Sequence, residues 1–337
     1  MTEAWGGGVA SAIASYVRAT PDAEHHAVIA VRDGDYVDDG ELGRFATVDA
    51  RRGQVALLRG VRDAVARIRP DAIHAHSSYG GLLARVVRPH GARVVYTPHC
   101  YAFERADLSR GARAAIRAVE RLLSVRTDVV AACSPREAAL TRSLNHRVRV
   151  VHVPNVADAP LSPPTRPDGP VETVVAVGRL SRQKDPAVFA TMARAHRDGP
   201  GRNLPFVWVG GGETDCRALE DAGVRITGWV PQSQVARELG GTSVYVHTAR
   251  WEGFPMAVLE AARSGVPVLA RRAAPFDHCP QRWVFDTEDA FLTMLASLDS
   301  PAVRAENVRE WRLALAENTA PVQRERLLSC YTGKDES

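Results

Sequence analysis

The sequence has few cysteines, and their positions follow no structural pattern. The 337 residues contain five cysteines, an odd number, and no C-x-x-C pair is present. The chain therefore predicts neither a disulfide framework nor a zinc site, and it fits the reducing cytoplasm. The cysteines are widely spaced, at Cys100, Cys133, Cys216, Cys279 and Cys330.

Long apolar runs and an N-terminal targeting signal are also missing. No stretch reaches the roughly 20 apolar residues that a membrane-spanning helix requires. The chain begins Met-Thr-Glu-Ala-Trp-Gly, without the basic and apolar regions of a signal peptide. We therefore expect a cytoplasmic protein that is neither secreted by a signal peptide nor integral to a membrane.

Runs of like charge are absent as well. The net charge is +4 and the sequence pI is about 8.9, with the positive charge spread over many arginines. No run is long enough to mark a nucleic-acid-binding arm, so we expect no nucleic-acid partner. The mild positive balance favours an anionic ligand or peripheral contact with an anionic membrane at the inner face.

Short apolar segments alternate with helical patterns along the chain, as in parallel βαβ units. A proline-dense stretch at 157–170 interrupts this alternation and predicts a linker. We expect one domain at 1–156, a second at 171–310, and a helical segment at 311–337 that caps the second domain or crosses back to the first. The predicted strands are 27–31, 72–76, 93–97, 129–133, 148–153, 174–177, 205–209, 243–247 and 266–270.

Two carboxylates eight positions apart, Glu252 and Glu260, flank the start of a predicted helix. Residues 244–248 alternate like a strand, and Pro255 suits the first helical position, where its missing N–H costs nothing. The free N–H groups and the dipole of this helix start suit an anion such as a diphosphate. Glu260 falls in an apolar helix and is predicted to be substantially buried, so it needs a partner. Ligand hydroxyls and a structural salt bridge to Arg263 both satisfy it.

Basic and glycine residues follow other predicted elements. Arg179 and Lys184 lie on the loop after strand 174–177, at the strand end where open α/β sheets bind ligands. Both side chains suit phosphate, although surface charge is an equally simple reading. Gly7 and Gly8 precede a helical pattern and would let backbone N–H groups approach an anion, unless they form a plain flexible terminus.

These residues together resemble the retaining glycosyltransferases of family 4, which have the α/β GT-B fold: two Rossmann-like domains facing across a cleft. The resemblance rests on Arg179, Lys184, the N-terminal glycines and the Glu252-x7-Glu260 pair inside E-G-F-P-M-x-x-L-E-A. It covers nearly the whole chain. It extends through H-A-H-S-S at 74–78, Y-T-P-H at 96–99, C-S-P-R-E at 133–137 and V-P-N at 153–155.

The resemblance implies a nucleotide-sugar donor, a UDP-sugar before a GDP-sugar, held mainly by the second domain. Glu260 would bind the ribose hydroxyls, and Glu252 and His99 would lie at the donor sugar. Arg179 and Lys184 would neutralise the departing diphosphate, so neither a divalent metal nor a further cofactor is implied. The phosphates would also meet Phe254, Pro255 and Met256, and the base would be lined by Thr227, Gly228, Trp229 and Val230.

The acceptor is left open by the sequence: a glycan, a lipid-linked acceptor or a small-molecule natural product. The helical pattern at 102–124 carries Arg110, Arg113, Arg117 and Arg121, which form either a solvated charged face or a surface for anionic lipid. A non-catalytic nucleotide-sugar-binding partner of another transferase is the alternative function. An NAD-dependent enzyme is disfavoured, because no G-x-G-x-x-G fingerprint stands in register after a strand.

Two features depart from the resemblance. Only five residues precede Gly6, so we expect the first strand to be missing or stunted. We also expect the chain to be truncated at its start, because the strand next to a missing first strand would have buried N–H and C=O groups without hydrogen-bond partners. No glycine occurs from 266 to 283, where a glycine-rich donor loop is expected. Apart from these departures, we assign His76 a capping or packing role and not a role at the donor sugar.

Overall fold

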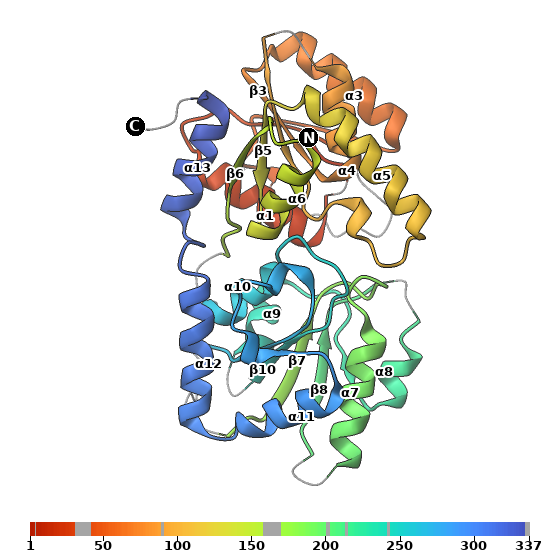
Figure 1. Ribbon diagram of the computed structural model, residues 1–337, viewed down its shortest axis with the longest axis vertical. Coiled ribbons are helices and arrows are strands. Elements are labelled where there is room, and N and C mark those ends of the chain that lie inside the picture. Colours follow the sequence, from red (N-terminus) through yellow and green to blue (C-terminus); the bar gives the residue numbers. More distant parts are fainter. Residues whose placement is uncertain are drawn as a thin grey trace. The chain divides into compact units, whose positions relative to one another are not determined.

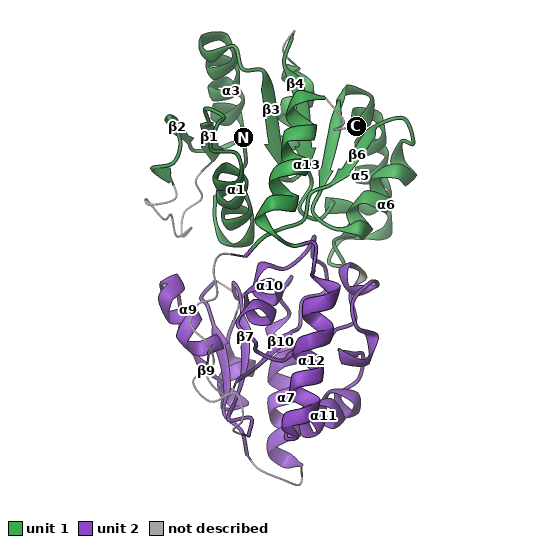
Figure 2. Cartoon of the chain, turned by 90° about the vertical axis from the view of Figure 1, so that its left-hand side faces the viewer, with its two compact units in different colours: residues 1–156, 318–337 green, residues 157–317 purple. Residues whose placement is uncertain are grey.

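The computed structural model describes residues 1–3, 5–30, 42–88, 91–157, 170–199, 203–212, 215–240 and 243–333. The chain divides into two compact units, which Figure 2 distinguishes by colour. Unit 1 consists of residues 1–156 and 318–337, and unit 2 of residues 157–317. The predicted linker at 157–170 lies outside the described residues except for its two ends.

Unit 1 is built on parallel strands. Four of them form a sheet in the order β3, β4, β5, β6, and β1 pairs with β2. Thr2 joins the two groups, because it makes single parallel bridges to Ile29 of β1 and His76 of β3. This one-residue bridge stands where the sequence predicts a missing or stunted first strand. The strands are β1 (His26–Ala30), β2 (Thr47–Arg51), β3 (Ala72–His76), β4 (Arg93–Thr97), β5 (Val129–Ala132) and β6 (Arg149–His152).

Helices cover both faces of this sheet (Figure 1). α1 (Gly7–Ala19) and the C-terminal α13 (Ala320–Thr332) pack together on one face, over Val95, Val129 and Ala131. On the other face, Tyr96, Val130 and Ala132 form a core with residues of the remaining helices. These are α3 (Gln54–Ile68), α4 (Ser77–Val87), α5 (Arg110–Leu123) and α6 (Pro135–Leu144).

Unit 2 contains one parallel sheet of six strands in the order β12, β11, β10, β7, β8, β9. The strands are β7 (Thr173–Val177), β8 (Phe206–Val209), β9 (Arg225–Ile226), β10 (Ser243–His247), β11 (Val268–Arg271) and β12 (Val284–Phe285). The helices are α7 (Pro186–Asp198), α8 (Arg217–Asp221), α9 (Gln232–Leu239), α10 (Met256–Arg263), α11 (Glu288–Ser297) and α12 (Pro301–Ala314). α7, α8 and α11 lie on one face, and α9, α10 and α12 on the other (Figure 1). The parallel α/β prediction is confirmed in both units.

Some boundaries differ from the sequence predictions. α10 begins at Met256, and Pro255 is the preceding residue with an extended backbone (ψ 125°), one position before its predicted place. The helix predicted at 102–124 is a short 3-10 turn (Ala102–Glu104) followed by α5, because Ser109 caps a new start by accepting from the N–H of Ala112. The C-terminal segment is two helices, of which α12 belongs to unit 2 and α13 to unit 1.

Candidate donor site

The loops after β7 and β10 bring Lys184 and Glu252 together. The Lys184 ammonium forms an ion pair with Oε1 of Glu252, and their side chains are 21% and 12% exposed. Parallel strands end at the same edge of a sheet, so loops that follow neighbouring strands meet there. A cation and a carboxylate that were predicted from separate motifs are therefore in contact in unit 2.

Hydrogen bonds to backbone carbonyls link these two loops. The Thr248 hydroxyl donates to the Lys184 carbonyl at 2.6 Å, and the Arg250 N–H donates to the Gln183 carbonyl at 2.9 Å. The Gln183 amide in turn donates to the Trp251 carbonyl at 3.0 Å. Three hydrogen bonds within the protein therefore position the loop that carries Lys184.

The last residue of β11, Arg271, contributes a further link from within the glycine-free stretch. Arg271 donates to Oδ2 of Asp185 at 2.6 Å, and the Arg250 side chain lies 3.9 Å from the same oxygen. Asp185 has a left-handed backbone (φ 54°) directly before α7. Arg271 thus connects the segment to the residue that follows Lys184, a connection that the sequence did not predict.

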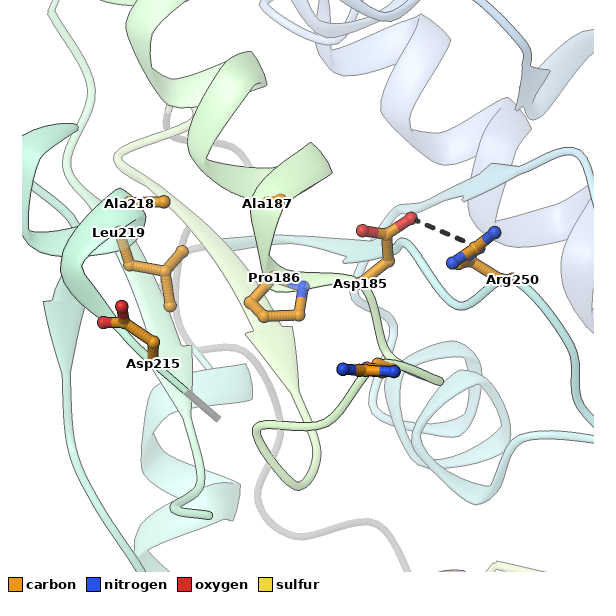
Figure 3. Close-up of a pocket in the computed structure, with 8 residues that line it drawn as sticks. Asp185, Pro186, Ala187, Asp215, Ala218, Leu219 and Arg250 are labelled. Carbon is orange, nitrogen blue, oxygen red and sulfur yellow. Dashed lines mark ion pairs between the residues drawn. The ribbon is translucent and has the colours of Figure 1, made fainter. Parts of the chain in front are cut away.

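A pocket of about 170 Å³ lies on the α7 and α8 side of these loops. Figure 3 shows Asp185 and Arg250 pointing toward each other at one side of this pocket, with Asp215 and Leu219 at the other. The residues that line it include none of the predicted donor-site residues. The pocket is therefore separate from the Lys184 and Glu252 pair.

Glu260 is half-buried, and this corrects the prediction of substantial burial. The Gln232 amide donates to its Oε1 at 3.1 Å. The buried face of α10 is formed instead by Ala257, Val258, Leu259, Ala261 and Ala262, and Glu260 lies at the edge of that face. This edge position leaves the carboxylate accessible to a ligand.

Trp229 precedes Gln232 in the segment after β9. Its side chain is exposed, and the guanidinium of Arg179 lies 5.8 Å from the ring centroid. An exposed indole beside a guanidinium is an aromatic surface on which another flat ring can stack. Trp229, Gln232 and Glu260 are suited to a nucleoside.

Three consecutive glycines after β8 allow this close packing. A Cβ at Gly210 would lie 2.2 Å from the carbonyl oxygen of Gly178, and one at Gly212 would lie 2.3 Å from that of Leu180. A Cβ at Gly211 would lie 2.8 Å from the ring of Trp229. The sequence predicts these glycines for tight turns. The structure shows a second reason: the loops after β7, β8 and β9 touch one another, and a side chain at these positions would collide with the neighbouring loop.

In unit 1, His99 follows β4 and bonds to His76 at the end of β3. His99 Nε2 lies 3.1 Å from His76 Nδ1, and the rings stack 5.3 Å apart. Burial lowers the pKa of His99 to about 4 and the pKa of His76 well below its usual value. The two imidazoles are therefore neutral at physiological pH and share one proton-bearing hydrogen bond.

His74 is held in a single neutral tautomer. The Thr97 hydroxyl donates to the Ala131 carbonyl at 2.8 Å, so its oxygen accepts the proton of His74 Nε2, also at 2.8 Å. His74 Nδ1 is then an acceptor for the Tyr331 hydroxyl at 2.8 Å. Burial lowers the pKa of His74 well below its usual value, in agreement with this assignment.

Two family models match the chain: a glycosyl transferase 4-like domain over residues 7–156, and glycosyl transferases group 1 over residues 171–300. The chain belongs to the group 1 glycosyltransferases. A galactosyltransferase of Escherichia coli, which acts from UDP-Gal on α-D-GlcNAc-diphosphoundecaprenol, is 25% identical over 307 residues, 79% of this chain and 74% of that protein. The GDP-mannose-dependent alpha-mannosyltransferase of Mycolicibacterium smegmatis is 31% identical over 226 residues, 60% and 56% of the two chains.

Solved structures show the same GT-B fold. Anabaena HepE, solved in complex with UDP and glucose, aligns with a TM-score of 0.74 at 14% identity and covers 99% of both chains. Sucrose-phosphate synthase from Thermosynechococcus elongatus aligns with a TM-score of 0.70 at 16% identity, over 95% of this chain and 88% of that one. The protein is a glycosyltransferase, and the alternative of a non-catalytic partner is not favoured.

The structure adds contacts that the sequence did not predict. His76 precedes α4, but its side chain makes no capping hydrogen bond and instead contacts His99. The alternation H-A-H at the end of β3 is the signal that was available, because it places His74 and His76 on one face of the strand. Gln232 and Arg271 had no comparable signal.

Gly7 and Gly8 form the first turn of α1 in this glycosyltransferase. Both are exposed, and Gly7 has a positive φ of 55° with open space where a Cβ would be. Their N–H groups stand at a helix start, where free N–H groups and the helix dipole suit an anion.

Among the described residues, no helix combines the length and the apolar character needed to cross a bilayer.

Proposed function

We propose that this glycosyltransferase moves a sugar from a UDP-sugar, with retention at the anomeric carbon, to a glycan, lipid-linked or natural-product acceptor. The observation that carries the proposal is the Lys184 and Glu252 pair at the carboxyl edge of the unit 2 sheet. The named relatives use UDP-Gal and GDP-mannose, and the HepE complex contains UDP and glucose. UDP is favoured because it occurs in the relative with the longer alignment.

Lys184 and Arg179 are the proposed source of positive charge at the departing diphosphate. Breaking the sugar–phosphate bond builds negative charge on the nucleotide, and preorganised cations stabilise that charge as it forms. A lysine ammonium has three N–H donors, so Lys184 can bond Glu252 and still donate to phosphate oxygens. Of the residues at the start of α10, Phe254 and Met256 can donate a backbone N–H, whereas Pro255 has none.

Glu260 is the proposed ligand of the ribose hydroxyls, with Trp229 and Val230 beside the base. Replacing Glu260 by alanine should weaken UDP binding by roughly tenfold, because a charged hydrogen bond contributes about 1.5 kcal/mol at a partly exposed position. Isothermal titration calorimetry with UDP measures the change. Glu238→Ala, which removes a carboxylate of α9 paired with Arg225, is the matched control and should leave the affinity unchanged. Equal affinity for Glu260→Ala and the wild type contradicts the assignment.

The donor and acceptor can be identified together. A thermal-shift screen of UDP- and GDP-sugars should find stabilisation by a UDP-sugar, because a ligand that binds only the folded state raises the melting temperature. Mass spectrometry of the products formed with candidate acceptors then gives the acceptor class, and NMR of the product gives the anomeric configuration. Stabilisation by GDP-sugars alone would show that the donor nucleotide is GDP and not UDP. A product with inverted anomeric configuration would refute the retaining mechanism.

His99, a residue of unit 1, is the proposed ligand of the donor sugar. The imidazole is neutral at physiological pH, so it can donate or accept a hydrogen bond with a sugar hydroxyl without adding charge. The support for this role is the match of Tyr-Thr-Pro-His at 96–99 to the family, together with the ordered histidine pair.

We also infer peripheral contact with an anionic membrane through α5. Arg113 and Arg117 are engaged with the protein, donating to the Phe103 carbonyl and the Ser143 hydroxyl, so they are poor reporters of lipid binding. The outward face of α5 and the turn after it instead expose Leu122 (72%) and Val125 (68%). Apolar side chains next to arginines are the pattern of an interfacial helix.

Replacing Leu122 and Val125 by glutamate should abolish binding to vesicles that contain anionic phospholipid, because it removes the apolar contact and adds repulsion. Vesicle co-sedimentation measures the bound fraction. Leu313→Glu, at a leucine of α12 with 69% exposure, is the matched control. Undiminished sedimentation of the Leu122 and Val125 variant would refute membrane contact through α5.

A further inference from the structure

The turn that carries His99 has an unfavourable backbone. His99 and the next residue, Cys100, both have positive φ angles, 51° and 86°, and neither is a glycine. Two consecutive left-handed residues with a Cβ persist only where the surroundings hold them, and such positions gather at functional sites. The turn therefore needs partners that hold it in this conformation.

The backbone of the turn is held by Glu137, the third residue of α6. Its Oε2 accepts the Cys100 N–H at 2.8 Å, and its Oε1 accepts the Cys133 N–H at 3.0 Å. The side chain is 2% exposed. Burial raises the pKa of Glu137, and its bonds from the two backbone N–H groups oppose that shift. Both carboxylate oxygens therefore act on backbone, one of them in a loop 37 residues away.

Helix capping alone does not explain this arrangement. Ser134 is the N-cap of α6, and its hydroxyl accepts the Glu137 N–H at 3.2 Å. In a capping box the glutamate returns to the N–H of the N-cap residue itself. Glu137 instead reaches the residue before the cap and the turn after β4, so its carboxylate links α6 to His99.

The imidazole of His99 is held separately. His76, which is 4% exposed, bonds its Nε2, and the Tyr16 ring stacks 6.5 Å away. Backbone and side chain of His99 are thus fixed by different elements, α6 on one side and β3 with α1 on the other. A group held this firmly has little conformational freedom to lose when it binds a ligand.

We propose that Glu137 is a positioning residue for sugar transfer, which holds His99 through the Cys100 N–H so that the imidazole meets a hydroxyl of the donor sugar. The inference rests on the proposed function, since His99 is there the sugar ligand. Glu137 touches no substrate and acts only through the turn. Its loss should therefore affect transfer of the sugar and leave binding of the nucleotide intact.

Glu137→Gln is the test, because a glutamine has one acceptor oxygen and its NH₂ group cannot accept the second N–H. We expect kcat for UDP release from UDP-glucose or UDP-galactose to fall by about 10- to 100-fold, the effect of a small misplacement of a contact group. The Kd for UDP, measured by calorimetry, should change less than about twofold, since the nucleotide is bound elsewhere.

Ser134→Ala is the matched control. It removes the N-cap of the same helix and lowers the melting temperature, but it leaves the Glu137 carboxylate and the Cys100 N–H in place. Its kcat should stay close to that of the wild type. A loss of kcat in Ser134→Ala equal to that in Glu137→Gln would show that helix stability alone is responsible and would overturn the proposal.

A second substitution tests the turn directly. Cys100→Gly removes the penalty of a positive φ, so the turn needs less support. In the Glu137→Gln background it should restore most of the lost kcat. If Glu137→Gln fails to fold, Glu137→Asp provides the test, because it keeps the charge but shortens the side chain by one methylene and so withdraws the carboxylate from the Cys100 N–H, and it should lower kcat with UDP binding unchanged.

Wild-type rates in Glu137→Gln, or in a folded Glu137→Asp when Glu137→Gln does not fold, would refute the positioning role. The lack of any rescue by Cys100→Gly would refute it as well. A wild-type enzyme that binds UDP but releases none from any UDP-sugar, with or without acceptor, would instead refute the proposed function. The two failures are therefore distinguishable.

Discussion

Alanine in place of Lys184 should slow sugar transfer by about 10²–10³-fold, the effect of removing one preorganised group that stabilises developing charge. Lys184 is held by its carbonyl bond from Thr248 and by its pair with Glu252, so it needs no reorganisation during the reaction. Single-turnover kinetics with saturating donor measure the step. The affinity for the intact UDP-sugar should change much less, because the additional charge on the diphosphate appears only as the bond to the sugar breaks.

Arg182→Ala is the control for the Lys184 experiment. Arg182 lies on the same loop and carries the same charge, but it is exposed and lines the pocket on the α7 and α8 side. It should transfer sugar at close to the wild-type rate. If Lys184→Ala also does so, Lys184 has no role at the diphosphate, and the donor-site assignment would have to be abandoned.

Replacing Glu120 by alanine should lower the free energy of unfolding by about 3–5 kcal/mol, because it leaves a buried charge without its partner. Arg85 donates to Glu120 at 2.8 Å, and the side chains are 2% and 5% exposed. The Arg85 guanidinium also lies 4.3 Å from the centroid of the Tyr96 ring, and the Tyr96 hydroxyl donates to Glu120 at 3.3 Å. Urea unfolding measures the change.

Two comparisons separate this effect from general loss of charge. Glu306→Ala, which breaks a surface pair with Arg282, should change the unfolding free energy by about 0–1 kcal/mol. The double variant Arg85→Met with Glu120→Leu should be more stable than Glu120→Ala, because it removes both charges together. Equal stability of Glu120→Ala and Glu306→Ala would contradict the importance of the buried pair.

The sequence predicts the strands whose patterns are strong. Segments 72–76, 93–97 and 243–247 match β3, β4 and β10, because each is a short, mainly apolar run between helical patterns. β2 is missed, because it is largely exposed and reads Thr-Val-Asp-Ala-Arg. β9 and β12 are missed as well, because a two-residue strand has no period to detect.

Part of the candidate site follows from the same reasoning. Arg179, Lys184 and Glu252 follow strands of one parallel sheet, so a common edge is expected from topology alone. The burial of Glu260 was overestimated, because an apolar helix composition does not reveal which residue lies at the edge of the buried face. Gln232 was missed for a similar reason, since a polar side chain on a surface helix has no distinguishing pattern.

The sequence by itself determined the alternation of strands and helices, the loops that bear the charged residues, and the glycosyltransferase family. Only the tertiary structure decided which groups meet. His76 with His99, Glu137 with Cys100, Arg85 with Glu120 and Arg271 with Asp185 are separated by 23, 37, 35 and 86 residues. The physical reason is range: periodicity tells which face a side chain occupies, whereas a hydrogen bond acts over about 3 Å and depends on where folding brings its partner.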